Sequence, residues 1–169
     1  MFRPMEGGVK SAQDTHAVDA SKLLPAEYYG FVAALVLFAS LFLPWFTAGP
    51  PNGQINGHMG TFNAWQTFGV LDYVLAAACL APFVLAWIII RGHKLTWRPG
   101  EVTMIIGLVA FTLIMMNGII LGKPGDPQDF ISRDIGYWVA LIGAAGIVVS
   151  GFLRQSKSIK GRRPPGSVN

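Results

Sequence analysis

Residues that could carry out chemistry are few in this chain and stand far apart. Cys79 is its single cysteine, so thiol–disulfide exchange, which passes electrons through a pair of cysteines, is excluded. His16, His58 and His93 lie in three different segments, whereas a metal site needs several ligands that converge. The sequence also lacks a glycine-rich phosphate loop and a serine nucleophile motif. It therefore predicts no catalytic residue, no cofactor and no metal site.

One connection, Gly49–Leu71 with the residue that follows it, combines aromatic rings, amides and an acid. Thr61 can cap a short helix in which aromatic residues recur at every third position. Such a helix either lies on the headgroups or over the mouth of a helical bundle, or it forms a docking surface for a partner. We expect Trp65 to cover the bundle and Asp72 to accept an indole or backbone N–H. The candidate functional residues are Trp45, Phe62, Trp65, Phe68, Asp72 and Asn117.

Asn117 places an amide inside a long apolar run. An amide in lipid seeks partners on neighbouring helices, and each such bond typically contributes about 0.6–2 kcal/mol. Asp72 and the loop around Trp65 are expected at the same depth. We expect Asn117 to form an interhelical hydrogen bond there, with a ligand contact as the alternative.

Four apolar runs must hold these candidates in place. Of the 169 residues, 52% are apolar and 13% are charged, and the charges avoid four long stretches. Each stretch has close to the ~20 residues that a helix needs to cross a bilayer. The expected spans are about 28–48, 73–90, 102–121 and 135–153. Short connections favour antiparallel neighbours, so the sequence predicts an all-α integral membrane protein with a four-helix antiparallel bundle over residues 27–153.

The positive charges predict an orientation. Eleven of the thirteen Lys and Arg residues lie before the first run, between the second and third runs, or after the fourth. Because such residues collect on the cytoplasmic side, we place both termini on the cytoplasmic side of the plasma membrane and Gly49–Leu71 on the outer side. Residues 1–26 are expected to be a disordered cytoplasmic segment, and 154–169 a basic cytoplasmic tail. The cations expected to contact anionic lipid, at about 1 kcal/mol each near the surface, are Arg154, Lys157, Lys160, Arg162 and Arg163.

Acidic and aromatic residues mark the ends of the runs. A carboxylate in the first turn of a helix satisfies free N–H groups and meets the positive end of the dipole. The acids in these positions are Glu27, Asp72, Glu101 and Asp134. Amphipathic rings are stable at the headgroup boundary, so the rings at the same levels predict an interfacial belt. The expected belt residues are Tyr28, Tyr29, Trp45, Phe46, Tyr73, Trp87, Trp97, Tyr137 and Trp138.

The fourth apolar run contains a stripe of small residues at near-helical spacing: Gly136, Ala140, Gly143, Ala144 and Gly151. Small residues let helices approach closely, either within the bundle or against a second copy or a membrane-protein partner. The spans contain no Asp, Glu, Lys, Arg or His, which argues against ion-coupled transport. The net charge of +4 is accounted for by topology, so nucleic-acid binding is not predicted.

The run Phe42-Leu43-Pro44-Trp45-Phe46, the glycine-rich connection, the segment Asn63–Phe68 and then Asp72 together carry a resemblance. This half of the chain resembles small uncharacterised four-span proteins of the plasma membrane in high-GC Gram-positive bacteria. The resemblance implies a membrane tetraspan and supplies no activity. We therefore expect a non-enzymatic accessory or scaffold subunit of a larger membrane complex. The alternative is a binding or permeation module for a lipid-like small molecule, with its site under the outer aromatic loop.

Overall fold

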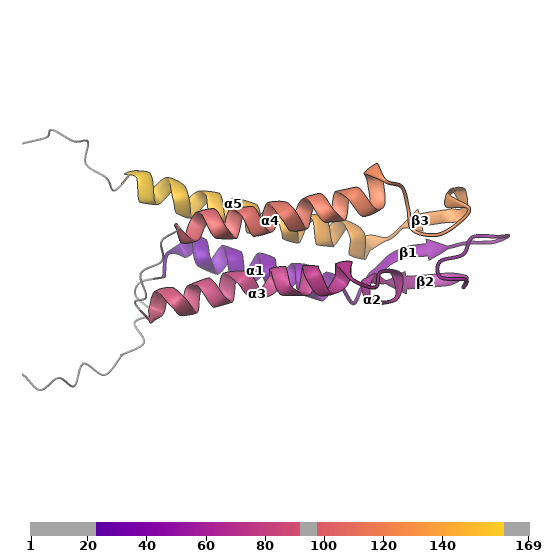
Figure 1. Ribbon diagram of the computed structural model, residues 1–169, viewed down its shortest axis with the longest axis horizontal. Helices are drawn as coiled ribbons and strands as arrows, with labels where there is room; N and C mark the ends of the chain where they lie inside the picture. The colour runs from indigo at the N-terminus through magenta and orange to yellow at the C-terminus, as the bar shows by residue number, and fades with distance from the viewer. Residues whose placement is uncertain (1–22, 92–97, 161–169) are drawn as a thin grey trace, which may run out of the picture.

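The computed structural model describes residues 23–91 and 98–160, and this part of the chain is mostly helical. Its long helices are α1 Pro25–Ser40, α3 Leu71–Ile90, α4 Pro99–Met115 and α5 Ile135–Lys160. They lie side by side, and successive helices run in opposite directions (Figure 1). Three helical stretches within the described residues are long and apolar enough to cross a membrane: Leu71–Ile90, Gly100–Ile120 and Ile135–Lys157.

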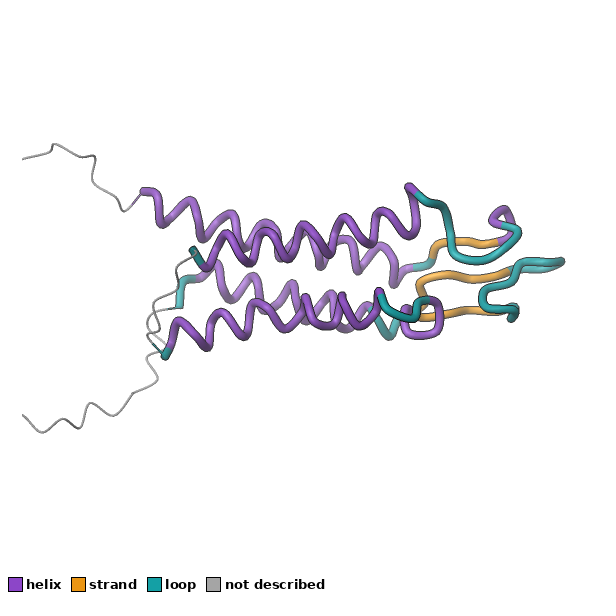
Figure 2. Tube along the Cα trace, in the orientation of Figure 1, coloured by secondary structure: helices purple, strands orange, loops and turns teal. Residues whose placement is uncertain are grey.

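A small antiparallel sheet covers one end of the helices (Figure 2). Its strands are β1 Pro44–Ala48, β2 Gly60–Asn63 and β3 Ile131–Arg133, in the order β2-β1-β3. The expectation of an all-α chain is therefore wrong at this end. We call it the sheet end, and we call the opposite end, where α1 begins and α3 ends, the basal end.

The first apolar run, expected to be one span over 28–48, divides into a helix and a strand. Helix α1 stops at Ser40, and the chain turns before β1 begins at Pro44. Proline disfavours the helical conformation in the residue before it. At the helix end the Ser40 carbonyl accepts from the Leu43 N–H at 3.1 Å and from the indole N–H of Trp45 at 2.7 Å. The next residues pair with β2 and β3 instead of continuing the helix.

The other apolar runs lie on the remaining long helices. Helix α3 contains Pro82, and α4 leads into a wider turn, the π-helix η2 Met116–Ile120. Two short elements complete the described chain: the single turn α2 Ala64–Thr67, which follows β2, and the 3-10 helix η3 Gln128–Phe130, which precedes β3.

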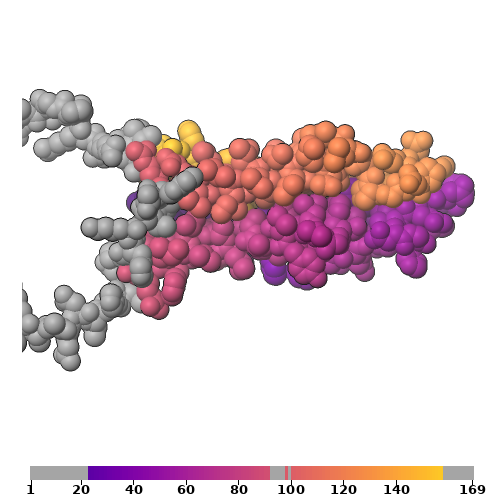
Figure 3. Space-filling view, viewed as in Figure 1, coloured from indigo at the N-terminus to yellow at the C-terminus, as the bar shows by residue number. Residues whose placement is uncertain are grey.

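Small residues bring α5 into close contact with both α1 and α4. Ala140 and Ala144 are fully buried. A Cβ atom added to Gly143 would lie 2.8 Å from the Leu37 backbone nitrogen on α1, and one added to Gly151 would lie 2.5 Å from the Met104 nitrogen on α4. The small-residue stripe is therefore occupied within the chain. The space-filling view shows the segments packed along the length of the described molecule (Figure 3).

Candidate functional site

A cluster of aromatic rings joins the sheet to the helices. Trp45 is fully buried and meets Phe68 and Tyr137 edge to face, with ring centroids 5.8 and 5.9 Å apart. Phe46 is also fully buried and contacts the same two rings. The prediction that Trp45, Phe46 and Tyr137 belong to an interfacial belt is therefore wrong. The sheet, which hydropathy alone does not reveal, removes these rings from the surface.

Other rings of the expected belt are exposed. Tyr28 and Tyr29 in α1 and Trp87 in α3 lie at the basal ends of their helices. Tyr73 and Trp138 are exposed near the sheet ends of α3 and α5. Trp97 falls outside the described residues. Two levels of exposed rings therefore remain, as an interfacial belt requires.

The helix expected to begin with a Thr61 cap does not form as predicted. Thr61 lies in β2 opposite Thr47, and the helical turn α2 begins only at Ala64. Asn63 is its cap: the side-chain oxygen of Asn63 accepts from the Gln66 N–H at 3.0 Å, and that of Gln66 accepts from the Asn63 N–H at 3.1 Å. This reciprocal capping box outcompetes a cap at Thr61, whose backbone belongs to the strand.

Trp65 and Asp72 are linked through Tyr73, and of the indole or backbone N–H that Asp72 was expected to accept, the structure shows the backbone one. The Trp65 ring packs against the rings of Tyr73 and Phe42, with ring centroids 5.5 and 5.9 Å apart. Its buried indole N–H has no hydrogen-bond partner within the described part of the chain. Asp72 is 2% exposed, and its carboxylate accepts from the Tyr73 backbone N–H at 2.9 Å. Tyr73 thus contacts both residues, through its ring and through its backbone.

Within the residues that the structure describes, Asn117 does not make the expected bond to another helix. Its amide nitrogen donates to the Leu113 carbonyl on its own helix at 2.9 Å, and its backbone leaves the helical conformation inside the π-helix. Links between segments at this level come from other donors. The Tyr137 hydroxyl donates to the Ile114 carbonyl at 3.1 Å, and the Arg133 side chain donates to the Gly118 carbonyl at 2.8 Å.

A row of hydroxyl groups crosses the outward face of the sheet. Thr47 on the central strand pairs with Thr61 on β2 and with Ser132 on β3. The Thr47 and Thr61 hydroxyl oxygens are 3.0 Å apart, and the Thr47 hydroxyl donates to the Asp134 carboxylate at 2.5 Å. We call Thr61, Thr47, Ser132 and Asp134 the hydroxyl face. Sequence reasoning missed it, because strands of three and four residues give little periodic signal.

Both edges of the sheet are partly covered. The Lys123 ammonium donates to the Ile131 carbonyl beside β3. At the other edge, the Asn63 backbone is engaged by the side chains of Gln66 and Thr67 in α2. Short, covered edges discourage the addition of further strands. The exposed Thr61 and Ser132 make the face of the sheet an accessible surface.

Comparisons of the chain with family models, with curated proteins and with solved structures find no match.

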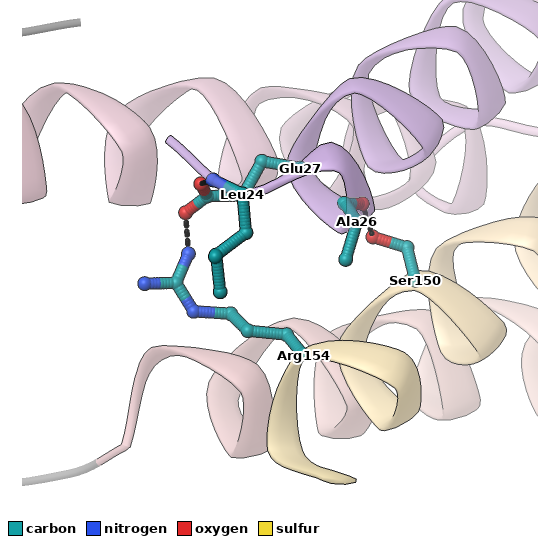
Figure 4. Close-up of polar contacts among 5 residues, drawn as sticks. All are labelled: Leu24, Ala26, Glu27, Ser150 and Arg154. Atoms are coloured by element: carbon teal, nitrogen blue, oxygen red, sulfur yellow. Dashed lines mark hydrogen bonds and ion pairs between the residues drawn. The ribbon is translucent and has the colours of Figure 1, made fainter. Parts of the chain in front are cut away.

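Sequence reasoning also missed a polar cluster at the basal end. Glu27, in the first turn of α1, is 7% exposed and pairs with the Arg154 guanidinium on α5 (Figure 4). As a helix-start acid it also accepts from the Leu24 N–H, at 2.6 Å. Beside the pair, the Ser150 hydroxyl donates to the Ala26 carbonyl at 2.7 Å. The partners lie at opposite ends of the sequence, so no local motif reveals them.

This pair changes the expected lipid contact of the tail. Arg154 belongs to α5, and its charge is engaged by Glu27 rather than free for headgroups. Lys157 is exposed one turn farther along the same helix. The side chain of Lys160 and residues Arg162 and Arg163 lie outside the described part of the chain.

A groove of about 660 Å³ lies between α1 and α5. Small residues, among them Ala33 and Gly146, form part of it, and Val32 and Leu153 stand at its exposed rims. The expected site was instead beneath the aromatic loop, where Trp45 and its neighbouring rings fill the space. In the described residues, no group of three or more His, Cys, Asp or Glu side chains could hold a metal ion.

Proposed function

We propose that this chain is a four-span protein of the plasma membrane that acts as a non-enzymatic accessory subunit and docks a partner through its sheet. In this proposal the basal end faces the cytoplasm and the hydroxyl face lies outside. The observation that carries the proposal is the preformed sheet, which is fixed to the helices by fully buried rings. A rigid surface loses little conformational entropy when a partner binds.

The surface of α1 supports its placement as a membrane span in addition to the three longer helices. The helix has 16 residues, which correspond to about 24 Å at 1.5 Å per residue, short of the ~30 Å hydrocarbon core. Phe42 and Leu43 in the turn after it are exposed and extend its apolar surface toward the sheet. The turn thus adds apolar length to the helix on the side where the helix is too short for the hydrocarbon core.

The charges support the orientation. Arg91, Arg98 and Lys157 are exposed at the basal end. At the sheet end, Lys123 and Arg133 donate to backbone carbonyls. Exposed positive side chains therefore gather at the basal end, as expected for a cytoplasmic side.

Photocrosslinking in intact cells tests the docking proposal. A photoreactive side chain at Thr61 and one at Ser132 should yield the same protein adduct, because both positions are exposed on the hydroxyl face. The same side chain at Tyr73, which is exposed on α3, should yield lipid adducts instead. Absence of a shared protein adduct from Thr61 and Ser132 would contradict the proposal.

The groove between α1 and α5 favours a second function, the binding of a lipid-like molecule. Its volume falls within the range of about 300–1,000 Å³ that is typical of ligand sites. Its residues belong to the two helices and not to the aromatic loop.

A further inference from the structure

We propose that the groove between α1 and α5 binds one acyl chain of an anionic phospholipid from the leaflet at the basal end, with the lipid headgroup at Lys157. This inference rests on the second proposed function and names its ligand. The other occupant that such a groove could take is a helix from a partner.

The length of the groove favours an acyl chain over a helix. On α5 the groove extends from Ile142 to Leu153, which is about 16 Å along the helix axis at 1.5 Å per residue. The hydrocarbon core is about 30 Å thick, so the groove spans roughly one leaflet. A transmembrane helix of a partner would cross both leaflets, whereas one acyl chain ends near the middle.

The lining of the groove is suited to hydrocarbon. The hollow exists where Ala33 and Gly146 face each other, because neither residue carries a side chain larger than a methyl group. Val32 and Ile142 are 61% and 69% exposed beside it. The Ser150 hydroxyl, which also borders the groove, already donates to the Ala26 carbonyl. Nothing in this set requires a polar ligand in the hollow itself.

Charge at the basal end selects the headgroup. Val149, Leu153 and Lys157 are spaced by four residues and therefore follow one face of α5. Val149 and Leu153 line the groove, and Lys157 is exposed one turn beyond it. Arg154 nearby is neutralised by Glu27. Lys157, which has no ion-pair partner among residues 23–91 and 98–160, thus presents a positive charge where the phosphate of a seated lipid would lie.

Native mass spectrometry of the full chain in mild detergent tests the site, with phosphatidylglycerol and phosphatidylcholine of matched acyl chains as probes. The wild type should retain one phosphatidylglycerol in preference to phosphatidylcholine. Val32→Trp should reduce retention of both lipids because the indole fills the groove. Val84→Trp, on α3 and similarly exposed at 52%, should leave it unchanged.

The headgroup has its own comparison. Lys157→Gln should lower the preference for phosphatidylglycerol by about fivefold, which corresponds to ~1 kcal/mol for one cation near anionic lipid. Arg91→Gln, at the basal end of α3, should not change it, because Arg91 stacks on Trp87 away from the groove.

Wild-type retention by a folded Val32→Trp variant, or an unchanged preference in Lys157→Gln, would overturn the site. Thermal unfolding of Val32→Trp beside Val84→Trp identifies a folding defect, and the Lys157→Gln comparison decides the question if one occurs. Failure of the sheet to crosslink a partner would leave lipid retention unaffected. The two proposals can therefore fail separately.

Discussion

The carboxylate of Glu27, which is buried, and the guanidinium of Arg154, whose side chain is 16% exposed, form an ion pair that ties the start of α1 to the basal part of α5. The carboxylate also accepts from the Leu24 N–H at 2.6 Å. Removal of one partner from a buried pair leaves an uncompensated charge, which typically costs about 3–5 kcal/mol. The pair is thus a point at which the stability of the basal end is sensitive to a single substitution.

Glu27→Gln and Arg154→Met should each lower the thermal unfolding temperature in detergent, and the double variant should be less destabilised than the sum of the two. Residues in one ion pair are coupled, so their effects are not additive. Arg98→Gln is a suitable control. Its charge lies 3.8 Å from Glu101 in an exposed pair, for which about 0–1 kcal/mol is expected. Strictly additive losses for Glu27 and Arg154 would show that the pair does not couple the helices.

Ala144→Leu should destabilise the chain by about 1–3 kcal/mol, because a larger side chain must displace neighbours in a filled interior. Ala144 is fully buried on α5. Ile142→Ala should have a smaller effect, since Ile142 on the same helix is 69% exposed. Thermal unfolding of both variants in one detergent gives the comparison. Equal unfolding temperatures for Ala144→Leu and the wild type would contradict the tight packing of α5.

Trp45→Phe and Trp65→Phe remove the same indole N–H from two different environments. The Trp45 N–H donates to the Ser40 carbonyl, which also accepts from the Leu43 N–H, so its removal costs one hydrogen bond, about 0.5–1.5 kcal/mol, in addition to any packing change. The Trp65 N–H has no partner in the described part of the chain. Trp65→Phe should therefore be the milder substitution in chemical or thermal unfolding. The reverse order would mean that Trp65 bonds to a group outside this structure.

Cysteine at Met59 should react with an impermeant thiol reagent in intact cells, and cysteine at Ser167 should react only after the membrane is permeabilised. Met59 is 52% exposed in the connection before β2, which the proposed orientation places outside. The native Cys79 is buried on α3 and provides a low background. Labelling at Ser167 in intact cells would reverse the orientation.

The long helices could be predicted from sequence because charge is excluded from them over many residues, and a bilayer allows few other structures. The division of 28–48 into helix and strand could not, because an apolar run has the same composition in both states. Pro44 was the available signal. The partners that hold β1 extended, Gly60–Asn63 and Ile131–Arg133, are too short to show a period of two.

The candidate site shows the same limit at the level of single residues. Sequence proximity correctly brought Trp65 and the start of α3 together, but it could not show that Tyr73 lies between Trp65 and Asp72. Asn117 was expected to form a hydrogen bond to another helix. The π-helix instead turns its amide back to Leu113, a distortion that depends on backbone geometry and not on residue type.

The central position of β1 has a consequence for the order of synthesis. The Thr47 hydroxyl donates to the carboxylate of Asp134, which lies 87 positions later in the chain, and the Trp45 ring packs against Tyr137 from the same region. At about 5–20 residues per second, a ribosome needs roughly 4–17 s to synthesise the residues between Thr47 and Asp134. Before β3 is synthesised, β1 can pair only with β2, and Trp45 lacks Tyr137. A nascent chain arrested before residue 130 should therefore leave Trp45 more accessible to fluorescence quenchers than it is in the complete chain.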